Sequence, residues 1–436
     1  MKQPIFFGNF ALIMLLISNI RQNKDEIISR LAIRGFDATA TINEILSIDE
    51  QARQARTNME QNQALGNQLS AQVGSLFKEG KKEEAEAIRQ ESVRLKEELK
   101  SLEIIVEEKE TELKNLLVTL PNTPNVSVPK GKDANDNFVS SIYGDKVNLP
   151  EGALPHWELA AKYDIIDFEL GVKITGAGFP VYKGKGAIFQ RALIQFFLNE
   201  AGSQGYMEIQ PPLMVNSDSG YGTGQLPDKE GQMYHSTIDD LYLIPTAEVP
   251  VTNIYRNVML NESQLPIKNC AYTPCFRREA GSYGAHVRGL NRLHQFDKVE
   301  IVQIVKPENS YEVLESMQTY VQSLLQKLGL HYRVLLLCGG DMGFTSAKTY
   351  DMEVWSPAQE MWLECSSVSN FETFQTNRLK CRYKNAEGKT ELAHSLNGSA
   401  LALPRIVAAL LEANQTPEGI VVPEVLRKYT GFDLIN

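Results

Sequence analysis

Mostly apolar side chains recur at alternating steps of three and four residues along two segments between Thr41 and Leu117. The first set is Ile45, Ile48, Ala52, Ala55, Met59, Asn62, Gly66, Leu69, Val73 and Leu76, and the second is Ile88, Ser92, Leu95, Leu99, Leu102, Val106, Lys109, Leu113 and Leu116. This spacing places each set on one helix seam and predicts a left-handed coiled coil. We expect the chain to reverse between Gly74 and Gly80, which would give an antiparallel hairpin roughly 50 Å long at 1.5 Å per residue.

The rest of the chain has a different pattern. Residues 120–150 are rich in Pro, Asn and Asp and are typical of a linker. Beyond them, short β-rich runs at 241–244 and 332–337 alternate with helical patterns at 187–202 and 310–328. This order predicts an α+β fold with a mainly antiparallel sheet flanked by helices. The predicted organisation is a coiled-coil arm at 14–119, a linker at 120–150 and a second domain at 151–436.

The first residues need a separate interpretation. Residues 5–17 form a mostly apolar run behind Lys2, as in a signal peptide, but the run is too short to span a bilayer as a helix. No A-x-A-like cleavage site follows, and residues 21–26 continue as an amphipathic helix. We expect translation to start at Met14, which makes 1–13 an upstream extension. The alternative is a targeting peptide. No membrane association is expected.

Composition narrows the class of protein. The chain is 43% hydrophobic and 22% charged, as in an ordinary globular protein. The net charge of −10 argues against a general electrostatic surface for nucleic acid, so any RNA contact must come from a local patch. The cysteines show no C-x-x-C pair, which favours reduced thiols in the cytoplasm over disulfides or a zinc site. They are Cys270, Cys275, Cys338, Cys365 and Cys381.

Charges on the predicted hairpin do not reveal its role. Lysine and arginine mix with glutamate along the second helix, as on a solvated face. From this pattern alone, a spacer or dimerisation arm with a solvated charged surface is favoured over an RNA-binding element.

Candidate chemistry lies in the second domain, where no P-loop and no dinucleotide-binding fingerprint occur. Residues 276–300 predict a strand, a loop and a returning strand. Arg277 and Glu279, two residues apart, would project from one face of the first strand. An arginine offers a bidentate fork to a phosphate or a carboxylate. A second arginine, Arg405, lies at the start of a helical run, which Pro404 suits.

Three ordered segments resemble the motifs of class II aminoacyl-tRNA synthetases. Residues 205–212 follow an amphipathic helix and resemble motif 1 with its dimer-interface proline, Phe276-Arg-x-Glu279 resembles motif 2, and 398–405 resemble motif 3. Within that class the chain resembles bacterial-type seryl-tRNA synthetases. The segments that carry this closer resemblance are Thr246-Ala-Glu248, Glu364-Cys-Ser-Ser367, Asn397-Gly-Ser399 and the hairpin. The resemblance covers nearly the whole chain from Met14.

The resemblance implies an activity, partners and a location. The enzyme would activate L-serine with ATP and Mg²⁺ to seryl-adenylate and pyrophosphate. It would then transfer serine to the 3′-terminal adenosine of tRNA(Ser), and also of tRNA(Sec). A homodimer in the cytoplasm is implied, in which each hairpin binds tRNA that is held across to the other subunit.

The resemblance also implies the residues of the site. The ATP residues would be Arg277, Glu279, Leu293, Phe296, Glu364, Cys365, Ser366, Ser367 and Arg405. Among these, Arg277 and Arg405 would be catalytic, gripping the α-phosphate and the γ-phosphate. Phe296 would stack on adenine and Glu279 would bind its edge. Glu364 and Ser367 would coordinate Mg²⁺.

The serine residues implied in the same way are Thr246, Ala247, Glu248, Arg277, Glu300, Asn397 and Ser399. Arg277 would also hold the serine carboxylate, Thr246 and Glu248 its ammonium group, and Glu300 and Ser399 its hydroxyl. A buried polar pocket built for a hydroxyl rejects alanine by about 10⁴-fold, because its polar groups would stay unpaired. Threonine would be excluded by crowding at its methyl group, which is a weaker filter.

Two other readings stay open at the level of sequence. A synthetase-like enzyme that loads a carrier protein would resemble the second domain but would lack the hairpin. A coiled-coil scaffold with an inactive synthetase domain would have lost Arg277, Glu279, Glu364 or Arg405, and all four are present. Threonyl and prolyl members of the class carry a C-terminal anticodon-binding domain, and this chain ends soon after Arg405.

Overall fold

The computed structural model describes residues 17–228, 231–279 and 287–436. The chain divides into two compact units, one made of residues up to Ala32 with Phe36–Pro121, and the other of Ile33–Gly35 with Asn122–Asn436. The expected start at Met14 and the upstream extension lie outside the described residues. So does most of the loop expected after Glu279.

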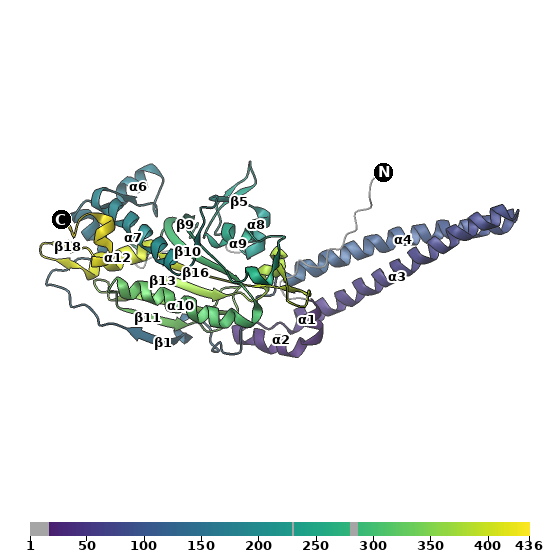
Figure 1. Ribbon diagram of the computed structural model, residues 1–436, viewed down its shortest axis with the longest axis horizontal. Coiled ribbons are helices and arrows are strands. Elements are labelled where there is room, and N and C mark those ends of the chain that lie inside the picture. Colours follow the sequence, from purple (N-terminus) through teal and green to yellow (C-terminus); the bar gives the residue numbers. More distant parts are fainter. Residues whose placement is uncertain (1–16, 229–230, 280–286) are drawn as a thin grey trace. The chain divides into compact units, whose positions relative to one another are not determined.

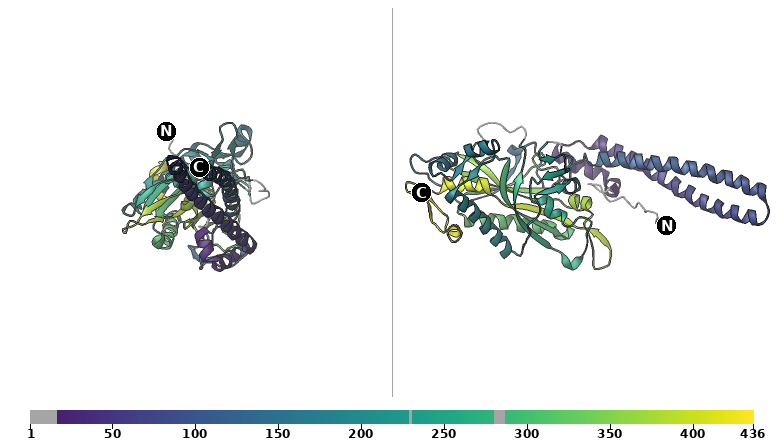
Figure 2. Two further views of the ribbon diagram at one scale, coloured as in Figure 1. Left: turned by 90° about the vertical axis from the view of Figure 1, so that its right-hand side faces the viewer. Right: turned by 90° about the horizontal axis from the view of Figure 1, so that it is seen from above.

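The first unit contains the predicted hairpin. Helices α3 (Thr39–Lys78) and α4 (Lys82–Leu117) run side by side and antiparallel, after the shorter α1 (Ile17–Gln22) and α2 (Lys24–Leu31) (Figures 1 and 2). Every predicted seam residue is buried or half-buried. The seam is most deeply buried at the base of the hairpin. There Ile42, Ile45, Leu113 and Leu117 pack with Ile20 and Leu31 of the short helices. The coiled-coil prediction is confirmed.

The reversal lies later than predicted. Helix α3 continues through Gly74 as far as Lys78, so the turn consists of Glu79, Gly80 and Lys81. Gly80 has φ +79°, the amide of Lys81 donates to the carbonyl of Leu76 at 3.0 Å, and the amide of Gly80 donates to Phe77 at 3.3 Å. These two bonds make a Schellman cap, which needs one left-handed residue and not two glycines. Gly74 lies inside helix α3 and does not interrupt it.

The second unit is built on an eight-stranded sheet. Its strands, in spatial order, are β1 (Phe138–Tyr143), β11 (Tyr332–Leu336), β12 (Lys348–Ser356), β13 (Met361–Asn370), β16 (His394–Ala402), β10 (Gln295–Val305), β9 (Ile267–Phe276) and β4 (Met207–Glu208). All neighbours are antiparallel except β4 and β9, which are parallel. The predicted α+β class with a mainly antiparallel sheet is confirmed.

Strand β1 lies within the predicted linker, where residues 138–143 pair with β11 at the edge of the sheet. All six residues of β1 are exposed, so the strand has no buried face that could produce alternating hydrophobicity. Backbone hydrogen bonding holds it in place, and this leaves no clear pattern in the sequence. Ile33–Gly35 also join this unit, where the Arg34 guanidinium donates to the carbonyls of Asn122 at 2.8 Å and Met342 at 3.1 Å.

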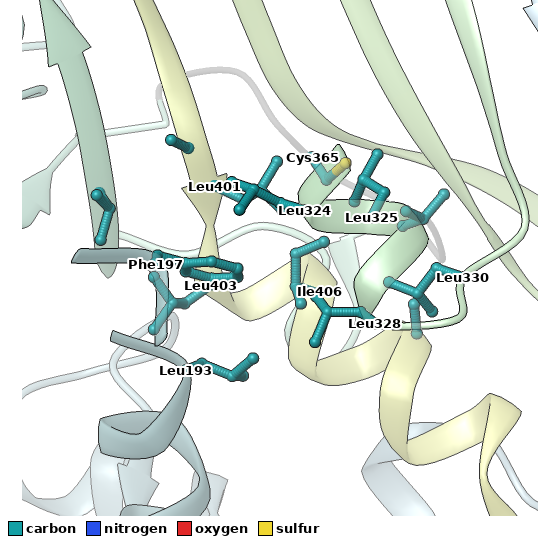
Figure 3. Close-up of a cluster of buried hydrophobic side chains, with 14 of the residues drawn as sticks. Leu193, Phe197, Leu324, Leu325, Leu328, Leu330, Cys365, Leu401, Leu403 and Ile406 are labelled. Atoms are coloured by element: carbon teal, nitrogen blue, oxygen red, sulfur yellow. The ribbon is translucent and has the colours of Figure 1, made fainter. Parts of the chain in front are cut away.

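Helices α7 (Gly184–Ser203), α10 (Ser310–Lys327) and α12 (Leu403–Ala413) pack on the sheet and form the main core with it. Figure 3 shows side chains from all three helices, among them Phe197, Leu324 and Ile406, together with Leu401 of β16. The helices predicted at 187–202 and 310–328 are confirmed, as are the predicted strands β7 (Leu241–Leu243) and β11. Pro404 lies in the first turn of α12, as expected.

Shorter elements complete this unit. They are α5 (His156–Lys162), β2 (Ile166–Asp167), α6 (Phe168–Ile174), β3 (Val181–Tyr182), β5 (Met214–Asn216), α8 (Ser217–Thr223), β6 (His235–Ser236), α9 (Glu248–Asn253), β8 (Met259–Asn261), α11 (Phe374–Leu379), β14 (Arg382–Lys384), β15 (Thr390–Leu392), β17 (Gln415–Thr416), β18 (Gly419–Val421), α13 (Glu424–Thr430) and β19 (Leu434–Ile435). Among the described helices, none has both the length and the apolar character to cross a membrane.

Candidate active site

A cavity of about 330 Å³ opens in the second unit, over the central strands of the sheet. Every residue that we expected in the ATP and serine sites lines it, except Ala247. These residues are Thr246, Glu248, Arg277, Glu279, Leu293, Phe296, Glu300, Glu364, Cys365, Ser366, Ser367, Asn397, Ser399 and Arg405. Ala247 is fully buried and packs with Val251, Ala271 and Val302.

The alternation of β10 supplies one wall of the cavity. Phe296, Lys298 and Glu300 share the face that lines it, whereas Val299 and Ile301 point into the main core. Across the sheet, Glu300 pairs with Ser399 of β16. The pairing of β10 with β16 therefore brings together residues that lie about a hundred positions apart in the sequence.

Arg277 and Glu279 reach the cavity by a different route from the one predicted. Strand β9 ends at Phe276, so neither residue is placed by strand alternation. Glu279 has φ +48°, and its carboxylate forms an ion pair with Arg292 from the returning segment. The Arg277 guanidinium donates from Nε to the carbonyl of Pro245 at 3.3 Å and lies 5.1 Å from the centre of the Phe296 ring. Loop conformation, not a shared strand face, brings the two side chains to the site.

Lys298 is a site residue that the sequence analysis missed. It is buried, it forms an ion pair with Glu300, and its ammonium group donates to Thr246 Oγ1 at 2.8 Å. Thr246 Oγ1 in turn donates to Glu300 Oε2 at 3.2 Å. The two-residue spacing of Phe296, Lys298 and Glu300 was the signal that could have identified it.

Glu248 begins α9 next to this network. Its carboxyl accepts a hydrogen bond from Gln375 Nε2 at 2.5 Å. Burial first, and then the negative charge of Glu300, raise the pKa of Glu248 to about 7, against the opposing effects of Gln375 and Lys298. An ammonium group placed beside Glu248 and Glu300 would relieve both effects.

Glu364, Ser367 and Arg405 meet at another edge of the cavity. Arg405 Nη1 donates to the carbonyl of Glu364 at 2.6 Å and lies 3.7 Å from its Oε2. The Glu364 side chain is half exposed and has oxygen ligands to offer, as has the Ser367 hydroxyl. Magnesium prefers such hard oxygen donors and is usually held by one or two side chains together with substrate phosphates. The residues at this edge therefore fit Mg²⁺ that arrives with a nucleotide.

Other lining residues were not assigned to the site from the sequence. They are Leu290, Asn291, Arg292, Ser369, Phe371, Ala402 and Pro404. Asp351 lies behind this lining, opposite Ser367 in the β12–β13 pair, and burial together with the charge of Glu364 raises its pKa. Leu290, Asn291 and Arg292 reach the cavity through folding of the loop after residue 286, and Ala402 and Pro404 lie within the segment that resembles motif 3. Cys365 is buried, and its thiol donates to the carbonyl of Met352 at 3.3 Å, as a packing residue would.

The cavity combines cations that suit phosphates with an enclosed pair of carboxylates that suits an ammonium group. Two family profiles match the chain: "Seryl-tRNA synthetase N-terminal domain" over residues 14–124 and "tRNA synthetase class II core domain (G, H, P, S and T)" over residues 233–414. A "Serine--tRNA ligase" of Salinibacter ruber is 52% identical over 425 residues, covering 97% of this chain and 99% of the relative. The chain belongs to the seryl-tRNA synthetase family. The resemblance found in the sequence is confirmed, and with it the enzyme class, a ligase that forms an aminoacyl-tRNA.

Solved structures of the family agree over the same length. Seryl-tRNA synthetase of Pyrococcus horikoshii, complexed with ATP, matches with a TM-score of 0.90 and 32% identity, covering 97% of this chain and 99% of that one. The cytoplasmic serine–tRNA ligase of Naegleria fowleri, in complex with AMP, matches with a TM-score of 0.86 and 27% identity, covering 97% and 98%. Both units of the chain therefore have counterparts in the family.

Proposed function

We propose that this enzyme activates L-serine with ATP and transfers it to tRNA(Ser). The observation that carries the proposal is one cavity in which Arg277 and Arg405 lie with two carboxyls, the half-buried Glu248 and the buried Glu300. A nucleotide triphosphate and an amino acid could occupy it together. The names of the relatives and the ATP and AMP complexes of the two solved structures support this assignment.

The first half-reaction joins the serine carboxylate to the α-phosphorus of ATP. A carboxylate oxygen forms a bond to that phosphorus, the bond to the bridging oxygen breaks, and pyrophosphate leaves. The attacking oxygen is already ionised, so positioning and charge neutralisation do the work and no protein base is required. We assign Arg277 to the α-phosphate and the serine carboxylate, and Arg405 to the γ-phosphate. Phe296, which already faces the Arg277 guanidinium, would stack on adenine, with Glu279 and Leu293 beside it.

Magnesium would be held by Glu364 and Ser367 and would neutralise charge on the phosphates. Contacts within the chain hold the other residues at this edge of the cavity in place. Arg405 binds the Glu364 carbonyl and so ties the first turn of α12 to β13. Cys365 and Ser366 contribute through strand position, and Ser366 Oγ donates to the carbonyl of Ser399 at 2.6 Å.

Serine selectivity is assigned to the network around Glu300. Thr246 and Glu248 would bind the ammonium group, Glu300 and Ser399 the hydroxyl, with Asn397 completing the pocket and Ala247 packed behind its wall. Lys298 keeps Glu300 paired inside a buried site. Alanine would leave these polar groups without a partner, which costs far more than the loss of a contact in water.

The remaining assignments concern the whole chain. We assign residues 14–119 as the tRNA-binding arm, 120–150 as the connecting segment, with its strand β1 in the sheet, and 151–436 as the catalytic domain. The arm would recognise the shape and backbone of a long variable arm, and not the anticodon. Charging of tRNA(Sec), a homodimeric assembly and action in the cytoplasm belong to the same proposal. The five unpaired thiols support a reducing compartment.

The deciding experiment is ATP–pyrophosphate exchange without tRNA, tested with all twenty amino acids and Mg²⁺. We expect exchange with serine, weak exchange with threonine and none with alanine. Arg277→Ala should abolish it. The matched control is Arg333→Ala, which removes an arginine from β11 of the same sheet, where it pairs with Glu353 outside the cavity. A folded wild-type enzyme without exchange for any amino acid would refute the proposal.

A further inference from the structure

A histidine and a glutamate form a buried pair just outside the cavity. His156 of α5 and Glu412 of α12 are both 0% exposed, and neither lines the cavity. His156 Nδ1 lies 2.8 Å from Glu412 Oε1, and the backbone amide of His156 donates to the same oxygen at 3.0 Å. Nothing in the proposed chemistry uses either residue.

The tautomer of His156 follows from its second nitrogen. The backbone amide of Leu290 donates to His156 Nε2 at 2.9 Å, so Nε2 carries no hydrogen. Nδ1 must then carry it and donate to Glu412. The returning segment packs directly on the ring: a Cβ on Gly289, which has φ +66°, would lie 2.3 Å from Nε2. The imidazole therefore bridges a carboxylate and the backbone of the segment 288–293.

Glu412 gathers donors from a third part of the chain. Ser356 Oγ and the amide of Ala358, at 3.3 Å, donate to its Oε2, and Gln359 Nε2 donates to Oε1 at 3.0 Å. Burial by itself would raise the pKa of Glu412, but the hydrogen bonds from His156 and Ser356 hold it below its usual value. A charged carboxylate thus ties α5, α12 and the turn between β12 and β13 together.

This hydrogen-bond network continues to the part of the cavity that we assign to ATP. Asn291 Nδ2 donates to Gln359 Oε1 at 2.7 Å, and Arg405 Nε donates to the carbonyl of Asn291 at 3.1 Å. Leu290, Asn291, Arg292 and Leu293 all line the cavity. Arg405 and Glu412 belong to the same helix.

We propose that His156 and Glu412 are positioning residues for ATP: they fix the segment 288–293 and, through Gln359 and Asn291, the guanidinium of Arg405. The inference rests on the proposed function. It concerns one half of the site only, because Thr246, Glu248 and Glu300 have no hydrogen bond to this network among the described contacts. Loss of the pair should therefore weaken the use of ATP and spare the recognition of serine.

The test measures KM for ATP and for serine, with kcat, in pyrophosphate exchange. Glu412→Gln and His156→Ala should raise KM for ATP by about tenfold or more and leave KM for serine within about twofold. His156→Gln can still accept from the Leu290 amide and should recover part of the loss. His156→Asn keeps a donor for Glu412 but not that acceptor, and it should recover less.

The matched control is His394→Gln. His394 is a half-buried histidine of the same unit, bonded to Ser310 Oγ at 2.9 Å and outside the cavity. We expect it to lower Tm without changing KM for ATP. If the variants of the buried pair fold poorly, Gln359→Ala, at a half-exposed turn position, should show the same split in weaker form.

Two results would overturn the inference. One is an unchanged KM for ATP in folded His156→Ala, Glu412→Gln and Gln359→Ala enzymes. The other is an equal rise of both KM values, which would indicate a general loss of structure. Failure of the proposed function is distinguishable, because the wild-type enzyme would then show no serine-dependent exchange at all.

Discussion

Glu248 is a half-buried carboxyl in the wall of the cavity, and its pKa is raised. Its pKa of about 7 in the folded protein lies above the usual 4.5, because burial and Glu300 disfavour the charged form. Between those two values the folded protein holds more protons than the unfolded chain, so the contribution of Glu248 to stability falls as pH rises from about 4.5 to 7. Above that range the cost of the buried charge is constant.

Serine binding should therefore release a proton from Glu248. An ammonium group beside the carboxyl favours its charged form, so we expect net proton release near pH 6.5 and almost none at pH 8.5. Calorimetric titration of serine, with a nonhydrolysable ATP analogue present, in two buffers of different ionisation enthalpy measures this release. Glu248→Gln should remove the buffer dependence. A buffer-independent heat for the wild-type enzyme at pH 6.5 would contradict the prediction.

Lys298 should matter for serine more than for ATP. Lys298→Met leaves the buried Glu300 without its cation, a change that costs about 3–5 kcal/mol for buried pairs. We expect serine-dependent exchange to fall by about 10²-fold or more, mainly through KM for serine. Lys348→Met is the control, because Lys348 of β12 is also a buried lysine, pairs with Glu315 of α10 and lies outside the cavity. Equal effects of the two variants would argue against a specific role for Lys298.

At the scale of elements, the two glycines near the tip of the hairpin should behave in opposite ways. Gly80 caps α3 with φ +79°, where a Cβ costs about 1–2 kcal/mol, although nothing lies within 4 Å of it. Gly74 is inside the helix with equally open surroundings, where alanine gains about 0.5–1 kcal/mol. Hydrogen exchange of peptides from the tip should be faster in Gly80→Ala and slower in Gly74→Ala. The same direction in both variants would refute the assigned turn.

The glycine of the third motif has a packing reason that only strand pairing reveals. Gly398 of β16 lies opposite Val368 of β13, and a Cβ on Gly398 would approach Val368 Cγ2 to 2.8 Å. The neighbouring Asn397 and Ser399 project to the opposite face of the strand and line the cavity.

At the scale of the whole molecule, the two units should divide the reaction between them. Replacing residues 41–117 with a short flexible linker keeps Ile33–Gly35, which belong to the catalytic unit. We expect serine-dependent exchange to stay near the wild-type level and aminoacylation of tRNA(Ser) to be lost, since activation needs only the cavity. Both are measured on the same preparation. Charging that survives the replacement would show that the arm does not bind the tRNA.

Periodic and local features were determined by the sequence itself. The three- and four-residue steps predicted the coiled coil, and the helices at 187–202 and 310–328 followed from the same kind of pattern. The resemblance of local motifs to the family named many of the cavity residues in advance, although it did not reveal Lys298 or the burial of Ala247 behind the wall. These features depend on neighbours within a few turns of chain, so a linear pattern records them.

Other features were decided only by the tertiary structure. Strand β1 forms through an edge pairing that leaves no buried face, and Arg277 and Glu279 reach the site by loop conformation after β9 has ended. Lys298 becomes a site residue because its ammonium group bonds to Thr246, which lies far from it in the sequence. The pair of His156 and Glu412 likewise joins positions 256 residues apart. Burial and charge act through space, so the raised pKa of Glu248 could be known only once Glu300 lay beside it.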